Sequence, residues 1–559
     1  MKDETSGRAN EYYKFSYIAL MVTIAYAILK KSVDLYFGSD ILALAASIQD
    51  DSYYYLLPAY NAAHGKGFSF GGELAYGFQV GYELILVGIA WFMNTMPDLL
   101  RTALFTNSVF FVGSGLVASL ASIHICRSAG IGQNRSLNAY LAGMVTAIAY
   151  FGNYWHFFNA TTAKENALAS LILSCIIFLQ ASSFTHNTTK KSAILGLACG
   201  LFLLTRPNPS TLIYVALSAY FNRRELRVFS ISALFPFILW GSFSITYFGT
   251  VLPFSLRLKA AADVTESIKE VFPRTFDYLL TSLEFGLFGP SNVMIPQPNW
   301  AQALREAAWE KTLYAGIFLA FMAFIALLWG GRRKANKEAV YFLLSCVVGM
   351  MIGACATGLS LILKRPNEIY YASWYFFDSP VIMSIFVGVG LHIFLCILKE
   401  KGTAKPNMLW RGISFSAASA CLLATFSIIG RYAAIDCYDR GYFWRGVDAM
   451  RWQNVMIAAG LWLKNEDKDL HQKRVAAFSA GALGFVLDDR AINLDGLAND
   501  EIAKAILRRT PMADYIRRAR PDYFIDIMSV SPGDFKLTNL KIFPFRYGGY
   551  QVSRFDYSN

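Results

Sequence analysis

The chain has 559 residues, of which 55% are hydrophobic and only 16% are charged, and its formal net charge is +12. Soluble domains contain roughly 25% charged residues, so this composition excludes an ordinary soluble protein. Apolar runs of roughly 20 residues recur, each long enough to cross a hydrocarbon core about 30 Å thick. The first run lacks a small-residue cleavage site, so we expect it to be retained. The sequence predicts a polytopic membrane protein.

Eleven apolar segments are candidate transmembrane helices. They are 15–36, 99–125, 137–157, 167–184, 192–204, 209–221, 228–247, 312–330, 339–362, 380–398 and 411–431. The fifth and sixth are short and are separated by TRPNPS, in which two prolines forbid one continuous helix. This pair is expected to form either two helices or one broken helix.

Positive charge is distributed unevenly between the connecting segments. Those on one side of the predicted spans hold eighteen Lys and Arg residues, whereas the whole of 32–98, on the other side, holds only Lys66. Because Lys and Arg are enriched in cytoplasmic loops, we place the N-terminus in the cytoplasm. With eleven spans, the C-terminal segment and the acid pair Asp50 and Asp51 then lie on the extracytoplasmic side.

The last segment, 433–559, is no longer apolar and holds 18 Lys and Arg against 16 Asp and Glu. RVAAFSAGALGFVL and PDYFIDIM are typical of short buried strands, and DEIAKAILRRT and MADYIRRAR are typical of helices. We therefore expect an all-α transmembrane domain of about 11 helices over 1–432, with outer loops 37–98 and 248–311, and a small extracytoplasmic α/β domain over 433–559. That domain has no basic stripe with interleaved aromatic residues, which argues against a nucleic-acid partner.

The cysteines and histidines give little support to a zinc site. Seven of the eight cysteines lie in or beside predicted spans, and Cys437 stands alone in the C-terminal segment, so an internal disulfide is not expected there. The six histidines form no HExxH motif, and the chain has no CxxC pair. No cofactor is required by the sequence, although Asp50 and Asp51 leave a divalent cation, Mg²⁺ or Mn²⁺, open.

The acid pair lies in QDDSYYYLLPAYNAAHGKGFSF, residues 49–70. A helix beginning at the two acids would place them in its first turn, where the helix dipole favours negative charge. Its tyrosines would form an interfacial face along the outer leaflet. Adjacent residues on a helix point about 100° apart, so one acid is expected to face a substrate as a general base. The simpler alternative is a solvated loop start.

The acid pair opens a series of motifs that runs along nearly the whole chain. DDSYYYLLPAYNAAHGKGFSF followed by YGFQVGYELILVGIAWF resembles the first outer loop of the GT-C class of glycosyltransferases, membrane enzymes that use polyprenyl-phosphate sugars. Later segments of that class are similar, in the same order, to TTAKENALASLI, LFLLTRPNPS, YFGTVLPFSLRLKA, RPNEIYYASWYFFDSP and FSAGALGFVLDDRAINLDGLAND. The class includes protein O-mannosyltransferases, lipid A aminoarabinose transferases and bacterial arabinofuranosyltransferases. Phe254 departs from its pattern, which has a polar residue there.

The resemblance implies transfer of a sugar from a polyprenyl-phosphate donor to an acceptor hydroxyl on the outer face, on a cell-envelope glycan, a glycolipid or a protein. Asp50 matches the catalytic acid of the family and is the expected base, with Asp51 as the second choice. Glu165 matches the acid of the second outer loop and is expected to orient the acceptor or the sugar. Asp495, in NLDGL, is either a turn residue or an acceptor contact.

Cations and aromatic residues near the outer ends of the spans are expected to bind the donor, because a departing phosphate needs fixed positive charge. The phosphate candidates are Lys66, Arg206, Arg257, Lys259, Lys364 and Arg365. The substrate-binding candidates are Tyr54, Tyr371, Trp374 and Tyr375. Each cation alone could instead be a snorkelling anchor, and each aromatic residue a member of an interfacial belt.

Two other functions stay open from the sequence. A transporter or flippase needs charged residues inside spans near the midplane, and the predicted spans are nearly free of them. A non-catalytic envelope-assembly protein would use the C-terminal domain to bind a partner. The absence of a transit peptide and the disulfide-free outer domain favour a bacterial inner membrane.

Overall fold

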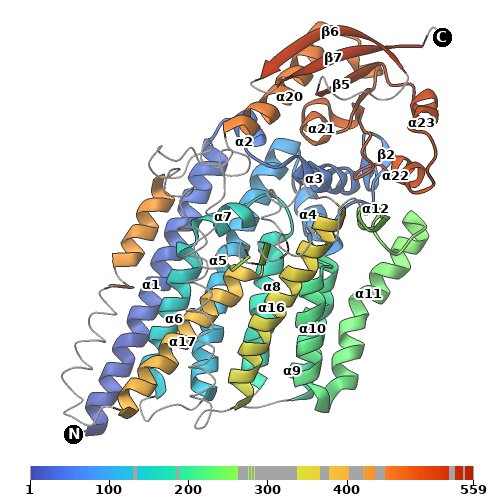
Figure 1. Ribbon diagram of the computed structural model, residues 1–559. Coiled ribbons are helices and arrows are strands. Elements are labelled where there is room, and N and C mark those ends of the chain that lie inside the picture. The colour runs from blue at the N-terminus through green and yellow to red at the C-terminus, as the bar shows by residue number, and fades with distance from the viewer. Residues whose placement is uncertain are drawn as a thin grey trace.

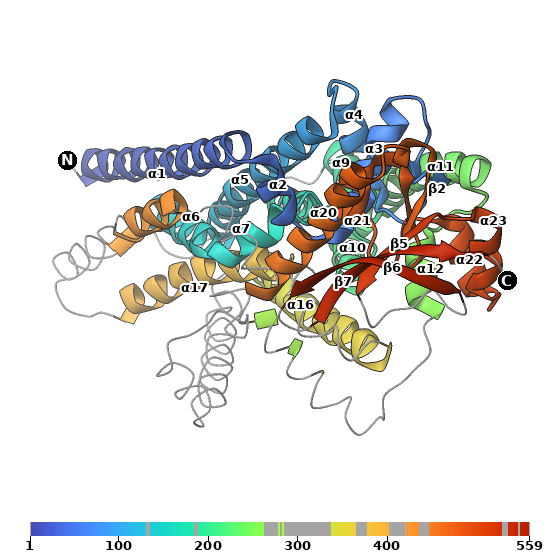
Figure 2. The same cartoon turned by 90° about the horizontal axis from the view of Figure 1, so that it is seen from above.

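The computed structural model describes residues 2–129, 135–183, 188–261, 275, 278–279, 282–283, 337–364, 377–401, 420–421, 423–434, 447–527, 535–545 and 548–557. A bundle of long helices carries a small domain with a β-sheet at one end, and the N-terminus lies at the opposite end (Figure 1). Seen from above, α1 extends away from this C-terminal domain (Figure 2).

The bundle agrees with a multi-pass membrane protein. Its long helices are α1 (Lys2–Gly38), α5 (Met96–Ala129), α6 (Arg135–Gly152), α8 (Asn166–Ser183), α9 (Thr189–Thr205), α10 (Pro209–Phe221), α11 (Leu226–Phe248), α16 (Lys337–Lys364) and α17 (Ser379–Lys401). Within the described ranges, four helices are long and apolar enough to cross a membrane: Met96–Ser128, Asn166–Ser183, Arg223–Phe248 and Tyr341–Leu359. The expected span 312–330 and part of 411–431 lie outside the described residues, so the count of eleven stays a prediction.

The TRPNPS segment separates two helices, α9 and α10. Pro207 disfavours helical backbone at the preceding residue, and Arg206 is extended, with φ −150° and ψ 80°. Asn208 then caps α10, because its side chain accepts a hydrogen bond from the Thr211 N–H at 2.8 Å. Pro209 begins the new helix, where it has no N–H to lose. The break therefore places Arg206 at the end of α9.

Short elements lie at the end of the bundle beneath the C-terminal domain (Figure 1). They are α2 (Ile41–Ala46), α3 (Asp50–Ala63), β1 (Ser69–Phe70), β2 (Glu73–Leu74), α4 (Val80–Ala90), α7 (Tyr154–Ala160) and α12 (Phe254–Ala261). The helix expected at the acid pair is confirmed as α3, but its expected exposure along the membrane surface is wrong. Tyr53 and Tyr54 are buried, because the C-terminal domain covers this face and Tyr53 packs against Phe485, with ring centroids 5.5 Å apart.

The described part of the C-terminal domain begins with α20 (Val447–Glu466). Its sheet has the order β4-β3-β5-β7-β6, in which β3 pairs in parallel with β4 and β5, and β7 pairs antiparallel with β5 and β6. The strands are β3 (Val475–Ala477), β4 (Ala491–Asn493), β5 (Tyr523–Ile527), β6 (Lys536–Phe545) and β7 (Gly548–Asp556). The helices are α21 (Gly481–Leu487), α22 (Asp500–Leu507) and α23 (Met512–Ala519). The expected α/β character, strand β5 and helices α22 and α23 are confirmed.

One expected strand is partly wrong. RVAAFSAGALGFVL contains the short strand β3 and then turns into helix α21. Small residues allow α21 to approach α3 closely, since a Cβ on Gly484 would lie 2.7 Å from Leu57 Cδ1 and 2.8 Å from Phe70 Cζ. This close packing joins the two domains, and their buried side chains form one continuous hydrophobic cluster.

Candidate active site

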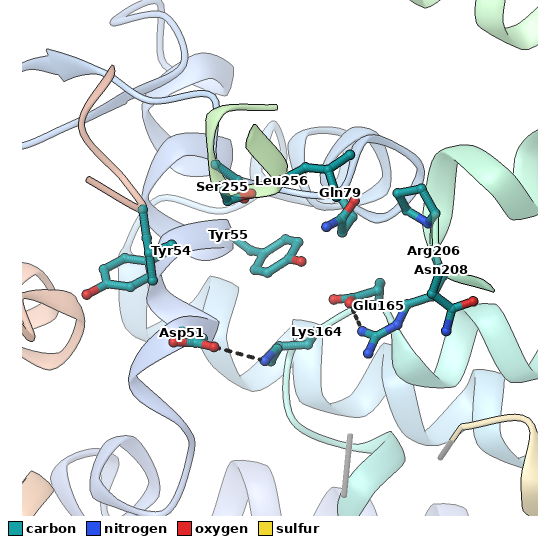
Figure 3. Close-up of a pocket in the computed structure, with 13 residues that line it drawn as sticks. Asp51, Tyr54, Tyr55, Gln79, Lys164, Glu165, Arg206, Asn208, Ser255 and Leu256 are labelled. Atoms are coloured by element: carbon teal, nitrogen blue, oxygen red, sulfur yellow. Dashed lines mark hydrogen bonds and ion pairs between the residues drawn. The ribbon is translucent and has the colours of Figure 1, made fainter. Parts of the chain in front are cut away.

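A cavity lies at the junction between the bundle and the C-terminal domain (Figure 3). Five parts of the bundle line it, and the C-terminal domain adds Leu497. The other lining residues are Asp51, Tyr54 and Tyr55 from α3, Gly77 and Gln79 before α4, Lys164 and Glu165 before α8, Arg206, Pro207 and Asn208 at the α9–α10 turn, and Ser255 and Leu256 from α12. The cavity therefore gathers three of the predicted site charges, Asp51, Glu165 and Arg206.

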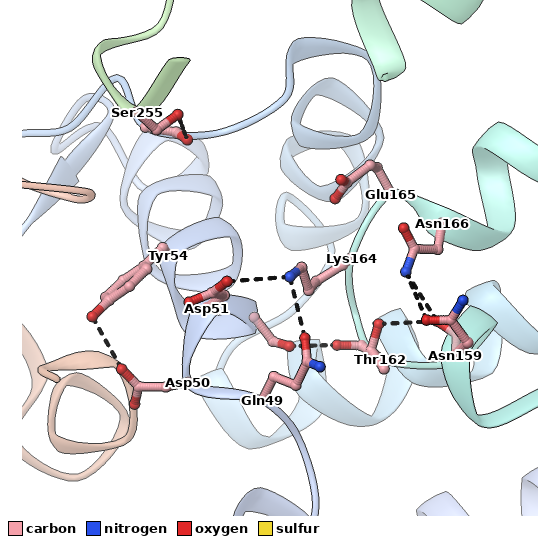
Figure 4. A network of polar contacts seen from close by, with 12 residues as sticks. Gln49, Asp50, Asp51, Tyr54, Asn159, Thr162, Lys164, Glu165, Asn166 and Ser255 are labelled. Carbon is pink, nitrogen blue, oxygen red and sulfur yellow. Dashed lines mark hydrogen bonds and ion pairs between the residues drawn. The ribbon is translucent and has the colours of Figure 1, made fainter. Parts of the chain in front are cut away.

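The two neighbouring acids face different partners. Asp50 points at the start of α21, where its carboxylate accepts hydrogen bonds from the Gly481 N–H at 3.2 Å and the Ala482 N–H at 2.8 Å. The Tyr54 hydroxyl donates a third bond to it at 3.0 Å (Figure 4). Burial raises the pKa of Asp50 above its ordinary value, although the Ala482 N–H opposes this. Asp50 is thus a contact between the domains.

Asp51 lies one position further along α3 and lines the cavity. Its Oδ2 atom is 3.3 Å from Nζ of Lys164, which also donates to Oε1 of Gln49 at 3.2 Å. The lysine side chain is only 5% exposed, whereas that of Asp51 is 44% exposed. A buried cation therefore holds an accessible carboxylate at the cavity wall.

Glu165 and Arg206, which also line the cavity, form a buried ion pair (Figure 3). The guanidinium also donates to Oδ1 of Asn166 at 3.0 Å. Burial alone would raise the pKa of Glu165, but the charges of Arg206 and Lys164 outweigh it and hold the pKa below its usual value. Glu165 is therefore ionised at neutral pH.

The C-terminal domain brings another carboxylate towards the cavity. Burial is the main cause that raises the pKa of Asp495 to about 7; the Leu497 N–H opposes the rise, and the charges of Asp51 and Asp50 add to it. Its Oδ1 atom accepts a hydrogen bond from the Leu497 N–H at 2.7 Å, so it also closes a turn. Tyr54 links this region to the acid pair, because its hydroxyl accepts a bond from Asn493 at 3.0 Å.

The remaining predicted ligands are dispersed. Lys66 does not line the cavity and forms an ion pair with Asp489 of the C-terminal domain, with Nζ and Oδ2 2.5 Å apart. Arg257 lines a second cavity instead. The side chains of Lys259 and Lys364 lie outside the described structure, as do Arg365, Tyr371, Trp374 and Tyr375. Their predicted roles stay predictions.

Among the described residues, no three His, Cys, Asp or Glu side chains gather as a potential metal site. Asp50 and Asp51 diverge, and Asp50 is engaged by backbone N–H groups that a cation would repel. Gln79, Asn208 and Ser255, which line the cavity, were not predicted from the sequence, and neither was Lys164. A charged residue next to Glu165, on the side poor in cations, was the signal that could have identified it.

Comparisons with known proteins agree with this architecture. Residues 445–555 match a family model described as Domain of unknown function (DUF8728). No curated protein matches the chain. The crystal structure of ArnT from Cupriavidus metallidurans in the apo state is similar, with a TM-score of 0.52 and 12% sequence identity, covering 97% of this chain and 98% of that one. The chain therefore shares the fold of ArnT over nearly its whole length.

Proposed function

We propose that this chain is a glycosyltransferase that moves a sugar from a polyprenyl-phosphate donor to an acceptor hydroxyl, with Asp51 as the general base. The observation that carries the proposal is the cavity in which an accessible carboxylate, Asp51, lies beside a buried ion pair, Glu165 and Arg206. The ArnT-like fold supports the same reaction class. The acceptor is a cell-envelope glycan, a glycolipid or a protein at the outer face of a bacterial inner membrane.

The reaction needs a base for the acceptor, and Asp51 has the better geometry. Its carboxylate lines the cavity, whereas that of Asp50 is directed at the backbone of α21. Asp51 takes the proton of the acceptor hydroxyl while the oxygen attacks the anomeric carbon. The bond from that carbon to the phosphate oxygen breaks, and its electron pair leaves with polyprenyl phosphate. The proton then passes from Asp51 to water.

The other charges position the reactants. Lys164 holds Asp51, and Arg206 supplies positive charge where a leaving phosphate would lie. Glu165 holds Arg206 through their buried ion pair. A sugar hydroxyl can bond to the polar side chains of Gln79, Asn208 and Ser255, which also line the cavity. Asp50 acts indirectly, since it fixes α3 against the C-terminal domain.

The test is transfer in reconstituted membranes. Purified protein is given a panel of polyprenyl-phosphate monosaccharides with cell-envelope extract as acceptor, and free polyprenyl phosphate is measured. We expect release by the wild type and a loss of about a hundredfold or more in folded Asp51→Asn, the range of a lost general base. Asp98→Asn is the matched control, because Asp98 is an exposed acid in the first turn of α5.

The Asp50→Asn variant separates the two acids. Its amide would direct an N–H at the α21 backbone donors, so we expect a lower unfolding temperature. Full activity in Asp51→Asn with a large loss in a folded Asp50→Asn would return the base to Asp50. No release from any donor by folded wild type would contradict the glycosyltransferase proposal.

A further inference from the structure

A second cavity, of about 390 Å³, lies beside the end of α11. Its lining residues are Phe248, Gly249, Thr250, Phe254, Arg257, Lys504, Leu507 and Arg508. They come from the end of α11, the loop after it, α12 and the C-terminal helix α22 with the residue that follows it. In both overall views α12 lies beside α22 (Figures 1 and 2). The volume falls in the range of small-ligand clefts.

Helix α12 separates this cavity from the candidate active site. Phe254 and Arg257 lie three residues apart and so share one face of the helix, and both line the second cavity. Ser255 and Leu256, between them, line the first cavity. Arg257 was expected to help bind the donor phosphate, but its side chain lines the second cavity.

The charges in the second cavity have one sign. Its charged lining residues are Arg257, Lys504 and Arg508, and the lining includes no acid. Within the described ranges, none of the three forms an ion pair. Arg257 and Lys504 both lie over the ring of Phe254, at 5.1 Å and 5.2 Å from its centroid. One aromatic side chain thus holds two cations near each other, where an anion would relieve their repulsion.

Neighbouring negative charges do not cancel the positive charge of Arg257, Lys504 and Arg508. Asp500 lies one turn before Lys504, but its Oδ1 atom accepts the Tyr76 N–H at 2.7 Å, and burial raises its pKa to about 6. Glu501 is exposed and lies 3.9 Å from Arg518. The C-terminal end of α11 adds only about half a negative charge. Three full positive charges outweigh these contributions.

The cavity also lies where lipid headgroups would be. Helix α11 is an apolar candidate span of which only 22% of the most hydrophobic window is buried, so most of its surface faces outward. Ile231, Leu234 and Ile238 are 70%, 56% and 62% exposed. The span ends at Phe248, which also lines the cavity. Acyl chains along α11 would therefore bring their headgroups to the three cations.

We propose that this cavity binds the headgroup phosphate of an anionic phospholipid. The phosphate accepts hydrogen bonds from Arg257, Lys504 and Arg508, while the acyl chains lie against the exposed face of α11. The inference uses none of the proposed transfer chemistry and holds whether or not the chain is a glycosyltransferase. A free phosphate or polyprenyl phosphate offers the same anion, and the experiment separates these sources.

The experiment measures lipid binding to the purified full-length protein by native mass spectrometry. Phosphatidylglycerol is titrated against phosphatidylcholine with the same acyl chains, and inorganic phosphate and polyprenyl phosphate are added as competitors. The wild type is compared with the double variant Lys504→Gln/Arg508→Gln. The matched control is Arg517→Gln/Lys541→Gln, which removes two exposed cations of the same domain that do not line the cavity.

We expect the wild type to bind phosphatidylglycerol about tenfold more tightly than phosphatidylcholine, and the double variant to lose that preference. The control should keep it, and all three proteins should unfold at similar temperatures. Equal binding of the two lipids, or an unchanged preference in a folded double variant, would overturn the site. Complete displacement by inorganic phosphate, or preferential binding of polyprenyl phosphate through the same cations, would overturn the phospholipid assignment.

Discussion

Asp51 and Lys164 are 113 positions apart in the sequence and form an ion pair at the cavity wall, with Oδ2 and Nζ 3.3 Å apart. The ammonium also donates to Gln49, the residue that precedes the acid pair. Because the lysine is buried and the aspartate is 44% exposed, the fixed partner is the cation. Lys164 therefore sets the position of the carboxylate that we propose as the base.

Removing this cation should slow the chemical step more than it weakens substrate binding. For Lys164→Gln we expect kcat to fall by about tenfold to a hundredfold with KM changed much less, because a misplaced base loses transition-state stabilisation. Lys164→Arg keeps the charge and should recover part of the rate. Release of polyprenyl phosphate measured over a range of donor concentrations gives both constants. An unchanged kcat in Lys164→Gln would show that the ion pair does not position the base.

The buried pair of Glu165 and Arg206 should behave differently in single and double variants. Arg206→Met leaves an uncompensated buried carboxylate, which should lower the free energy of unfolding by about 3–5 kcal/mol. Removing both charges in Arg206→Met/Glu165→Met avoids that cost and should restore part of the stability. The unfolding temperatures of the wild type, both single variants and the double variant measure the coupling. Additive effects would mean that the two charges do not stabilise each other.

Local sequence patterns predicted much of the fold. The structure has helix α3, the break around Pro207 and helices α22 and α23 where they were expected. Each of these features depends on residues near it in the sequence. Helix α21 was missed because two glycines and a valine among its seven residues lower its helical preference, and packing against α3 compensates for that. That contact joins segments more than 400 positions apart, so no local pattern reports it.

The site residues were also predicted only in part, because local patterns do not report contacts between distant segments. Residue types and motif order indicated Asp51, Glu165 and Arg206, and these line one cavity. The family resemblance favoured Asp50 as the base. Two neighbouring acids on a helix differ in direction, and which one faces the cavity depends on what packs against each face of the helix. The N–H groups of α21 engage Asp50 from the C-terminal domain, which leaves Asp51 on the cavity side.

The raised pKa of Asp495 predicts how the stability of the protein changes with pH. Burial raises its pKa from 3.8 to about 7, so the folded protein binds this proton more tightly than the unfolded chain does. Protonation therefore favours folding, and the contribution of Asp495 to stability decreases as the pH rises from about 4 to about 7. The unfolding temperature of Asp495→Asn, relative to that of the wild type, should rise over this interval.

The measurement is a thermal unfolding series at pH 5, 6, 7 and 8. Asp514→Asn is the control, since Asp514 is on the same domain and its side chain is 47% exposed. A constant difference between Asp495→Asn and the wild type across the series would contradict the shifted titration. A matching trend in Asp514→Asn would assign the effect to the net charge of the domain.

Gly481 tests whether the contact with Asp50 holds the two domains together. A Cβ at this position would lie 2.3 Å from the Asp50 carbonyl oxygen and 2.7 Å from its Oδ1 atom, so Gly481→Ala must displace α21 from α3. Such overpacking costs about 1–3 kcal/mol, and we expect a lower unfolding temperature, faster proteolytic release of the C-terminal domain and reduced transfer.

Gly88→Ala provides the matched control for this substitution. A Cβ on Gly88 would meet no atom within 4 Å, and alanine is the better helix former, so stability should stay the same or rise slightly. If Gly481→Ala keeps its stability and its resistance to protease, the Asp50 contact does not hold the domains together. If it releases the domain yet transfers sugar at the normal rate, Leu497 and Asp495 have no part in the reaction, and the cavity formed by the bundle is sufficient.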